Sequence, residues 1–148
     1  MVLVELVDRL TRRMRTAGRT GRTIVLRMRF DDYSRATRSR TVRRPTSASA
    51  PVLAAVRDLL EEARPTIGRR GLTLLGVAVA GLDDEESAQL ELPLDEAVPG
   101  AALDAALDAV RDRFGPASVT RASLIGRDPG LASFLSPRPG GRRGGDRR

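Results

Sequence analysis

The stretch TIVLRMRFDDYSRATRSRTV, residues 23–42, contains two alternating segments separated by an acidic pair. Apolar residues of the first segment recur at every second position: Ile24, Leu26, Met28 and Phe30. This alternation is typical of a strand with one buried face. Asp31-Asp32 interrupts the pattern, and a second segment rich in arginine, threonine and serine continues to about Val42. The sequence therefore predicts a β-hairpin that has one face toward a core.

The position of the turn decides which arginines of the hairpin face solvent. A two-residue turn at Asp31-Asp32 places three pairs opposite each other on the outward face: Arg27 and Ala36, Val25 and Arg38, Thr23 and Arg40. The outward face would then carry a positive surface made of Arg27, Arg29, Arg38 and Arg40. The same register places Arg35, Thr37 and Ser39 on the core side. A bulge or a longer turn would reverse part of the second strand, so both orientations of its arginines stay open.

Composition excludes several classes of site. The chain has 148 residues and a net charge of +7, with no cysteine and no histidine. A Cys/His zinc site, a disulfide framework and a Ser–His or Cys–His catalytic pair are therefore excluded. No apolar run reaches the ~18–20 residues of a membrane span, and the N-terminus lacks the pattern of a secretion signal. We expect a cytoplasmic protein that has no membrane partner.

Charge is segregated along the chain. From Arg9 to Arg44 there are thirteen arginines and only two acidic residues, whereas from Asp83 to Asp112 there are ten acidic residues and one arginine. A basic half of this kind indicates a nucleic-acid-binding face. The alternative is an exposed sheet that is merely cationic. No aromatic residue lies on the predicted outward face to stack on a base, so recognition would be of phosphates.

Further helices and strands are predicted around the hairpin. Residues 3–16 have helical spacing of apolar side chains. A second helix is expected to be capped by Ser47 or Ser49, to carry Pro51 in its first turn, and to end at Pro65. LTLLGVAVAGL, residues 72–82, is apolar at nearly every position, which predicts a strand partly covered on both faces or inside a sheet.

The C-terminal part contains one more helix. Residues 101–114 have an apolar stripe that should pack on the domain or on a neighbour, and Gly115-Pro116 should end the helix. Its acidic ridge, formed by Asp104, Asp108 and Asp112, is interpreted as a solvated face. ASVTRASLI, residues 117–125, is a candidate short strand, and the basic tail should be disordered.

These elements predict an α+β fold. It consists of a small, mostly antiparallel sheet with helices on one face, a C-terminal helix and a disordered basic tail. We divide the chain into a nucleic-acid-binding domain (residues 1–82), an acidic linker (83–100), a C-terminal helix with a short strand (101–126) and a tail (127–148).

Several pieces of the sequence, in this order, resemble the little-finger domain of Y-family DNA polymerases, DNA polymerase IV branch. They are GRTGRTIVLRMRFDDYSRATRSRTV (18–42), LLEEA (59–63) and LTLLGVAVAGL (72–82), and DAVRDRFGPASVTRA (108–122) resembles the C-terminal region of such polymerases. The resemblance covers about residues 3–82. It implies a β-α-β-β-α-β domain whose open sheet face lies along the backbone of template–primer duplex DNA.

The resemblance also implies the residues of the interface. The phosphate contacts would be Arg27, Arg29, Thr37, Arg38, Ser39 and Arg40. Two departures from the family are the missing strand before the first helix and the missing palm, fingers and thumb. We therefore expect no polymerase activity from this chain on its own and no cofactor, since Mg²⁺ would belong to the palm.

The acidic linker contains a second motif, QLELPL. It resembles the bacterial sliding-clamp-binding peptide, and its residues would be Gln89, Leu90, Leu92, Pro93 and Leu94. Gln89 would reach a pocket rim while Leu92 and Leu94 fill an apolar cleft. Pro93 would limit the conformations lost on binding. The expected partner is the β sliding clamp.

The resulting hypothesis is sequence-independent binding of the duplex DNA backbone combined with sliding-clamp tethering, as the C-terminal part of a translesion DNA polymerase in repair of DNA damage. Two alternatives remain open: a non-catalytic, clamp-recruited adaptor of a mutagenesis complex, and an unrelated basic α+β RNA-binding domain. The sequence leaves the oligomeric state open.

Overall fold

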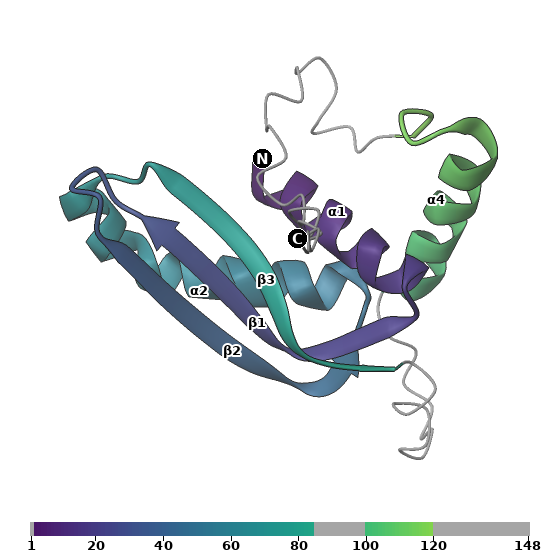
Figure 1. Ribbon diagram of the computed structural model, residues 1–148, viewed down its shortest axis with the longest axis horizontal. Helices are drawn as coiled ribbons and strands as arrows, with labels where there is room; N and C mark the ends of the chain where they lie inside the picture. Colours follow the sequence, from purple (N-terminus) through teal and green to yellow (C-terminus); the bar gives the residue numbers. More distant parts are fainter. Residues whose placement is uncertain (1, 85–99, 120–148) are drawn as a thin grey trace, which may run out of the picture.

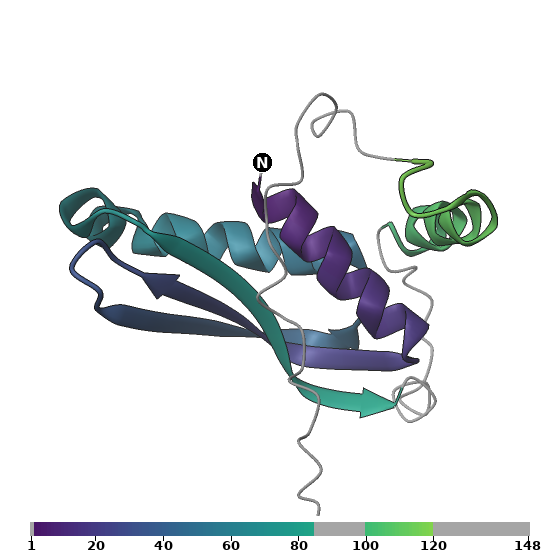
Figure 2. The same cartoon turned by 45° about the horizontal axis from the view of Figure 1, so that its top comes forward.

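The elements form one three-stranded sheet with helices on one side. The computed structural model describes residues 2–84 and 100–119. The elements in chain order are α1 (Val2–Thr16), β1 (Arg19–Arg29), β2 (Arg35–Thr46), α2 (Ser49–Arg70), β3 (Leu74–Asp84) and α4 (Ala101–Phe114). The sheet is antiparallel with the order β2-β1-β3, and Figures 1 and 2 show α1 and α2 on the same face. The predicted α+β class and the antiparallel sheet are confirmed.

The hairpin between β1 and β2 closes through three residues, not two. The Phe30 N–H donates to the Ser34 carbonyl at 2.9 Å, and the Tyr33 N–H donates to the Phe30 carbonyl at 3.0 Å. Tyr33 lies in the left-handed region with φ 62°, as is usual for the last residue of a three-residue hairpin loop. The two-residue turn was wrong, and the extra residue moves every side chain of β2 to the face opposite to that predicted.

The core lies between the sheet and the two helices. The alternating apolar residues of β1, with Phe30 directly after it, are all buried, as predicted: Ile24, Leu26, Met28 and Phe30. They pack with α2 and α1 in one cluster that includes Val7, Val52, Ala55, Val56, Leu59 and Ala63. Full burial of one large apolar side chain is worth about 1.5–3 kcal/mol. This cluster therefore fixes the opposite face of β1, which carries Arg27 and Arg29, toward the outside.

Helix α2 differs from its prediction at both ends. It continues past Pro65 to Arg70, and the Gly71 N–H then donates to the Ile67 carbonyl at 2.9 Å. An interior proline removes one N–H and crowds the carbonyl four residues earlier, but Ile67, in the turn beyond it, packs against the core and favours continuation of the helix. The predicted serine cap was also wrong, since the N-cap residue is Ala48, whose own side chain forms no cap hydrogen bond.

Strand β3 is an edge strand of the described sheet. One face, formed by Leu75, Val77 and Val79, packs against the core. The other face carries Gly76 and Ala78, which lie opposite Arg27 and Val25 of β1. The predicted cover on both faces is absent among the described residues. The outward-facing apolar residues are small in the middle of the strand, and those at its ends, Leu74 and Leu82, are exposed.

Helix α4 packs on α1 through its acidic ridge, so the prediction of a solvated ridge was wrong for Asp104 and Asp108, whereas the Asp112 side chain is exposed. Asp104 is only 4% exposed, and the Arg15 Nε donates to the Asp108 Oδ2 at 2.6 Å. Arg12 donates to Asp112 at 2.9 Å. The apolar stripe is turned partly outward, and its end residues, Leu103 and Phe114, are 59% and 68% exposed. Arginines on the facing side of α1 determine this orientation.

Other predictions fall partly outside the described residues. Residues 117–119 are not in a strand, whereas the rest of the candidate short strand, most of the linker and the basic tail lie outside the described part. Within residues 2–84 and 100–119, no helix has both the length and the apolar character needed to cross a bilayer.

Candidate nucleic-acid interface

The face of the sheet away from the helices is cationic and polar along β1 and β2. The register pairs Arg29 with Arg35, Arg27 with Thr37 and Val25 with Ser39. All of these side chains lie on the outward face, because they alternate with the buried residues of β1. In the middle of β3 the same face carries only Gly76, Ala78 and Ala80, between the exposed leucines Leu74 and Leu82. A large ligand can approach the sheet closely along that middle stretch.

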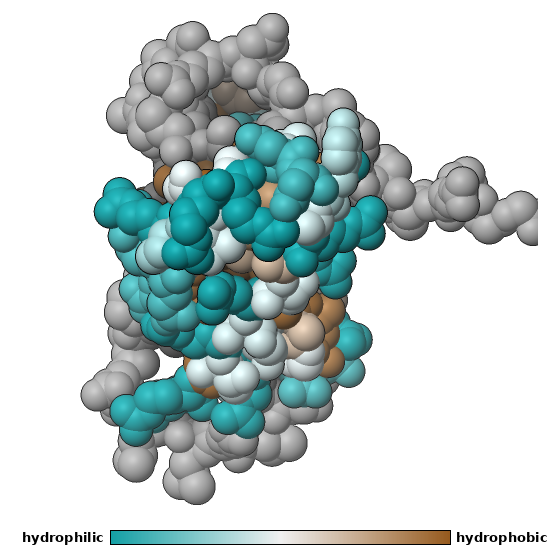
Figure 3. Space-filling view, turned by 90° about the vertical axis from the view of Figure 1, so that its left-hand side faces the viewer, coloured by the Kyte–Doolittle hydropathy of each residue, from teal (hydrophilic) through white to brown (hydrophobic). Residues whose placement is uncertain are grey.

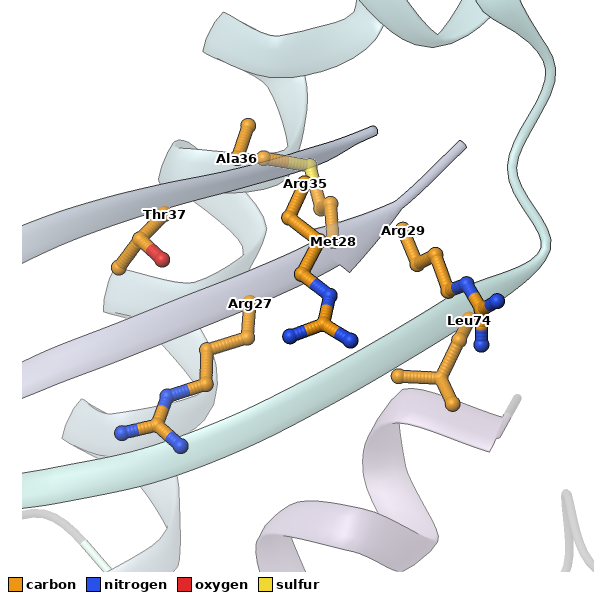
Figure 4. A pocket seen from close by; sticks show the side chains of 7 residues that line it. All are labelled: Arg27, Met28, Arg29, Arg35, Ala36, Thr37 and Leu74. Carbon is orange, nitrogen blue, oxygen red and sulfur yellow. The ribbon is translucent and has the colours of Figure 1, made fainter. Parts of the chain in front are cut away.

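Three arginines surround a shallow hollow at the turn end of this face. Figure 4 shows the guanidinium groups of Arg27, Arg29 and Arg35 on the same side of the sheet, with Thr37 and Leu74 also lining the hollow. We call this site the arginine hollow. Among the described residues, none of the three arginines forms a salt bridge. The Nε of Arg29 is enclosed and has no hydrogen-bond partner there. Like charges gathered without counter-charge favour an anionic ligand.

The predicted phosphate contacts divide between the two faces. Arg27, Arg29, Thr37 and Ser39 lie on the outward face, whereas Arg38 and Arg40 lie on the helix side opposite Leu26 and Ile24. Arg40 forms ion pairs with Asp58 and Glu62 of α2. The outward orientation predicted for Arg38 and Arg40 was wrong because of the longer turn.

Sequence reasoning missed Arg35, which it placed on the core side. The sequence does not determine the loop length: a loop of one more residue brings Arg35, Thr37 and Ser39 to the outward face together. The candidate clamp-binding residues, Gln89 to Leu94, lie outside the described residues.

The turn is fixed to the C-terminal end of α2. Asp32 accepts hydrogen bonds from the Ser34 N–H at 3.0 Å and from the Arg70 Nη2 at 2.6 Å. The Ser34 hydroxyl, the Arg70 guanidinium and the Ser34 amide together lower the pKa of Asp32 to about 2. Arg70 also lies over the Phe30 ring at 4.8 Å. These contacts hold the loop in one conformation.

A second set of contacts joins the turn to the start of β3. The Thr73 hydroxyl donates to the Asp31 Oδ1 at 2.9 Å, and the Thr73 N–H donates to the Arg29 carbonyl at 2.9 Å. Gly71, at φ 68°, leaves room for the Asp31 carboxylate. The arginine hollow is therefore bordered by a turn that two other elements hold in place.

An aromatic side chain lies beside the hollow, at the tip of the hairpin. Tyr33 is 74% exposed, and the Arg29 guanidinium lies 5.0 Å from the centre of its ring. The end of the molecule that carries this turn presents mostly hydrophilic side chains (Figure 3). Sequence reasoning assigned no role to Tyr33, because the predicted two-residue turn made it the first residue of the second strand and not part of the loop.

Comparison with known proteins identifies the family. Residues 1–92 match the impB/mucB/samB family C-terminal domain. The chain belongs to this family. DNA polymerase IV 2 of Mesorhizobium japonicum is 34% identical over 129 residues, which cover 79% of this chain and 31% of the relative. DNA polymerase IV of Pelotomaculum thermopropionicum is 34% identical over 122 residues, or 82% of this chain and 30% of the relative.

A third relative, DNA polymerase IV of Streptomyces coelicolor, is 49% identical over 79 residues, or 53% of this chain and 16% of the relative. The predicted resemblance to the little-finger domain of the DNA polymerase IV branch is confirmed. The chain spans less than a third of the length of these three relatives.

Ion pairs within the fold neutralise several arginines of the basic N-terminal half of this little-finger domain. Arg12 and Arg15 of the basic half pair with carboxylates of α4, and Arg19 pairs with Asp84 at 2.9 Å. The block of thirteen arginines is thus not one surface. Within the described ranges, no group of three or more acidic residues is arranged to hold a metal ion.

Proposed function

We propose that this little-finger domain binds duplex DNA through the sugar–phosphate backbone, independently of base sequence. The observation that carries this proposal is the arginine hollow, where three guanidinium groups lie on one open face and have no salt-bridge partner within residues 2–84 and 100–119. A guanidinium matches the geometry of a phosphate and can donate two parallel hydrogen bonds to it. Hydroxyl groups of Thr37 and Ser39, next along β2, can donate to neighbouring phosphates.

The character of the face favours backbone contact over base reading. Outward side chains of β1 and β2 are arginine, threonine, serine and valine on an extended sheet, and none belongs to a helix that could enter a groove. The bare stretch of β3 lets one DNA strand lie against the sheet beside Arg27. Binding of this kind should depend strongly on salt and should need no divalent cation.

A matched pair of arginines on β2 tests the interface. Arg35→Gln should weaken affinity for a blunt duplex several-fold and make the salt dependence shallower by about 1 in log–log slope, because one phosphate contact is lost. Arg40→Gln removes the same charge from the same strand on the helix side and should leave DNA affinity almost unchanged. Fluorescence anisotropy at several salt concentrations, with EDTA present, measures both.

Structured RNA serves as the second ligand in that titration. Tighter binding to RNA than to duplex DNA would support the RNA-binding alternative, and equal effects of the two substitutions would contradict the outward interface.

The biological setting follows from the relatives, which are DNA polymerases by name. We propose that the domain holds a translesion polymerase of the DNA polymerase IV type on its template–primer, and that it transfers no nucleotide by itself. Support comes from the share of the relatives that the chain spans, less than a third. A primer-extension assay with Mg²⁺ and all four deoxynucleotides tests the second part. Any extension by the purified chain would contradict it.

Tethering to the β sliding clamp is a further part of the proposal. Its support is the sequence QLELPL, residues 89–94, directly after the domain. Leu92→Ala combined with Leu94→Ala should abolish capture by immobilised clamp while leaving duplex affinity intact. Arg35→Gln should weaken duplex affinity and leave capture by the clamp intact. Unchanged capture of the leucine variant would contradict the tether. If the wild-type chain binds the clamp but has little affinity for duplex DNA, the result would favour the adaptor alternative, in which DNA contact is secondary.

A further inference from the structure

Turn chemistry explains the backbone conformation of residue 33 but not the presence of a tyrosine there. It is the only non-glycine residue with positive φ among the described residues. The left-handed conformation favours glycine, asparagine or aspartate and is costly for a bulky side chain. Residues held in such conformations are frequent at binding sites. The surrounding contacts of Asp32, Ser34 and Arg70 keep the backbone in this conformation.

The Tyr33 ring does not contribute to the core either. It is 74% exposed, and its packing partner is the guanidinium of Arg29, which lies 5.0 Å from the ring centre. A cation against an aromatic ring forms a flat platform on which another flat group can stack. The acidic residues of the loop accept hydrogen bonds within the fold: Asp31 from Thr73, and Asp32 from Arg70 and Ser34.

Arg29 joins this platform to the arginine hollow, because its guanidinium belongs to both. A nucleotide whose phosphate lies in the hollow has its base one sugar away. Bases inside a duplex are stacked on both sides, and the terminal pair has one free face, at the end of the helix. An unpaired base next to the duplex is free to turn and stack on Tyr33.

We propose that Tyr33 and Arg29 form a stacking site for an unpaired nucleobase at the end of a duplex. This inference rests on the proposed function for the position of the duplex, and it adds a preference for duplex DNA that has a single-stranded overhang. Stacking on one aromatic side chain changes affinity by roughly 5-fold or more. We expect about 5- to 10-fold tighter binding to a duplex with a two-nucleotide overhang than to the blunt duplex.

Two variants separate the ring from the backbone. Tyr33→Asn removes the ring but suits the left-handed backbone, so folding is retained; it should abolish the overhang preference and leave blunt-duplex affinity unchanged. Tyr33→Phe keeps the ring and should keep the preference. An overhang of abasic nucleotides should bind the wild-type chain no better than the blunt end.

A spectroscopic readout is available because the chain has one tyrosine and no tryptophan. Its intrinsic fluorescence therefore reports on Tyr33 alone, and it should be quenched by the base-bearing overhang but not by the abasic one. Binding to the blunt duplex without overhang preference or quenching would overturn this inference only. Failure to bind either duplex at low salt would overturn the proposed function as well. An overhang preference that survives in Tyr33→Asn would assign the effect to another residue and overturn the role of Tyr33.

Discussion

Side chains of β2 alternate between the outward face and the helix side, so the role of each residue depends on whether it lies an odd or an even number of positions after the turn. The alternation of β1 could be predicted from the sequence, because four buried apolar residues recur at every second position. The register could not, since a three-residue loop requires Tyr33 to adopt a conformation that tyrosine usually avoids. Contacts from Arg70, distant in sequence, stabilise that conformation. This is why Arg35 was missed and Arg38 and Arg40 were misplaced.

Gly71 is the residue whose side-chain space matters most for this turn. A Cβ at Gly71 would lie 1.8 Å from the Asp31 Oδ2, at a backbone φ of 68°. We predict that Gly71→Ala lowers the free energy of unfolding by about 1–3 kcal/mol. Gly68→Ala is the matched control, because it lies inside α2 with no atom within 4 Å of the added Cβ. It should raise stability by about 0.5–1 kcal/mol. Urea denaturation measures both, and a change of the same sign in the two variants would contradict the packing at Gly71.

Asp32 gives the turn a pH dependence in the acid range. Its pKa is lowered from 3.8 to about 2, chiefly by the hydrogen bond from the Ser34 hydroxyl and then by that from Arg70. Because the folded pKa is below the unfolded one, the stabilisation is fully present above about pH 4 and is lost as the pH falls through about 2. The side-chain carboxyl ¹³C shift of Asp32 should therefore titrate near pH 2. A midpoint near 3.8 would show that the carboxylate has no such partners.

At the scale of elements, the least predictable contact is that between α4 and the start of α2. Helix α4 could be predicted from its apolar spacing and from the glycine that ends it. Its docking could not, because Asp104 accepts a hydrogen bond from the backbone N–H of Ser49, 55 residues earlier, at 2.7 Å. From the sequence alone an acidic ridge is expected to be solvated, because the sequence does not show that arginines of α1 face it. The buried carboxylate replaces the serine cap that was expected within α2.

The cap supplied by Asp104 should dominate the stability that α4 contributes. Asp104→Ala leaves the Ser49 N–H without its acceptor and Arg15 with one carboxylate fewer, so we predict a loss of about 1–3 kcal/mol. Asp112→Ala removes a carboxylate whose side chain is 73% exposed and should change stability by less than about 0.5 kcal/mol. Thermal unfolding monitored by circular dichroism compares them. Equal losses would contradict the cap.

At the scale of the whole molecule, charge is divided between internal pairing and one open face. The basic N-terminal half was predicted from composition to be a nucleic-acid surface, and composition alone could not show which arginines pair inside the fold. Arg12 and Arg15 pair with α4, and Arg40 pairs with α2. The outward arginines of the hairpin remain without such partners among the described residues. Net charge therefore overestimates the extent of the cationic surface. The strand register shows which arginines form that surface.

The salt dependence of duplex binding tests the central claim most directly. The triple variant Arg27→Gln, Arg29→Gln, Arg35→Gln neutralises the arginine hollow, and Arg57→Gln, Arg64→Gln, Arg69→Gln removes the same net charge from exposed positions on α2, across the sheet. We predict that the log–log slope of affinity against salt becomes shallower by roughly 2.7 in the first variant, at about 0.9 per phosphate contact. The slope should stay nearly unchanged in the second. Equal slopes for the two variants would contradict a DNA interface at the arginine hollow.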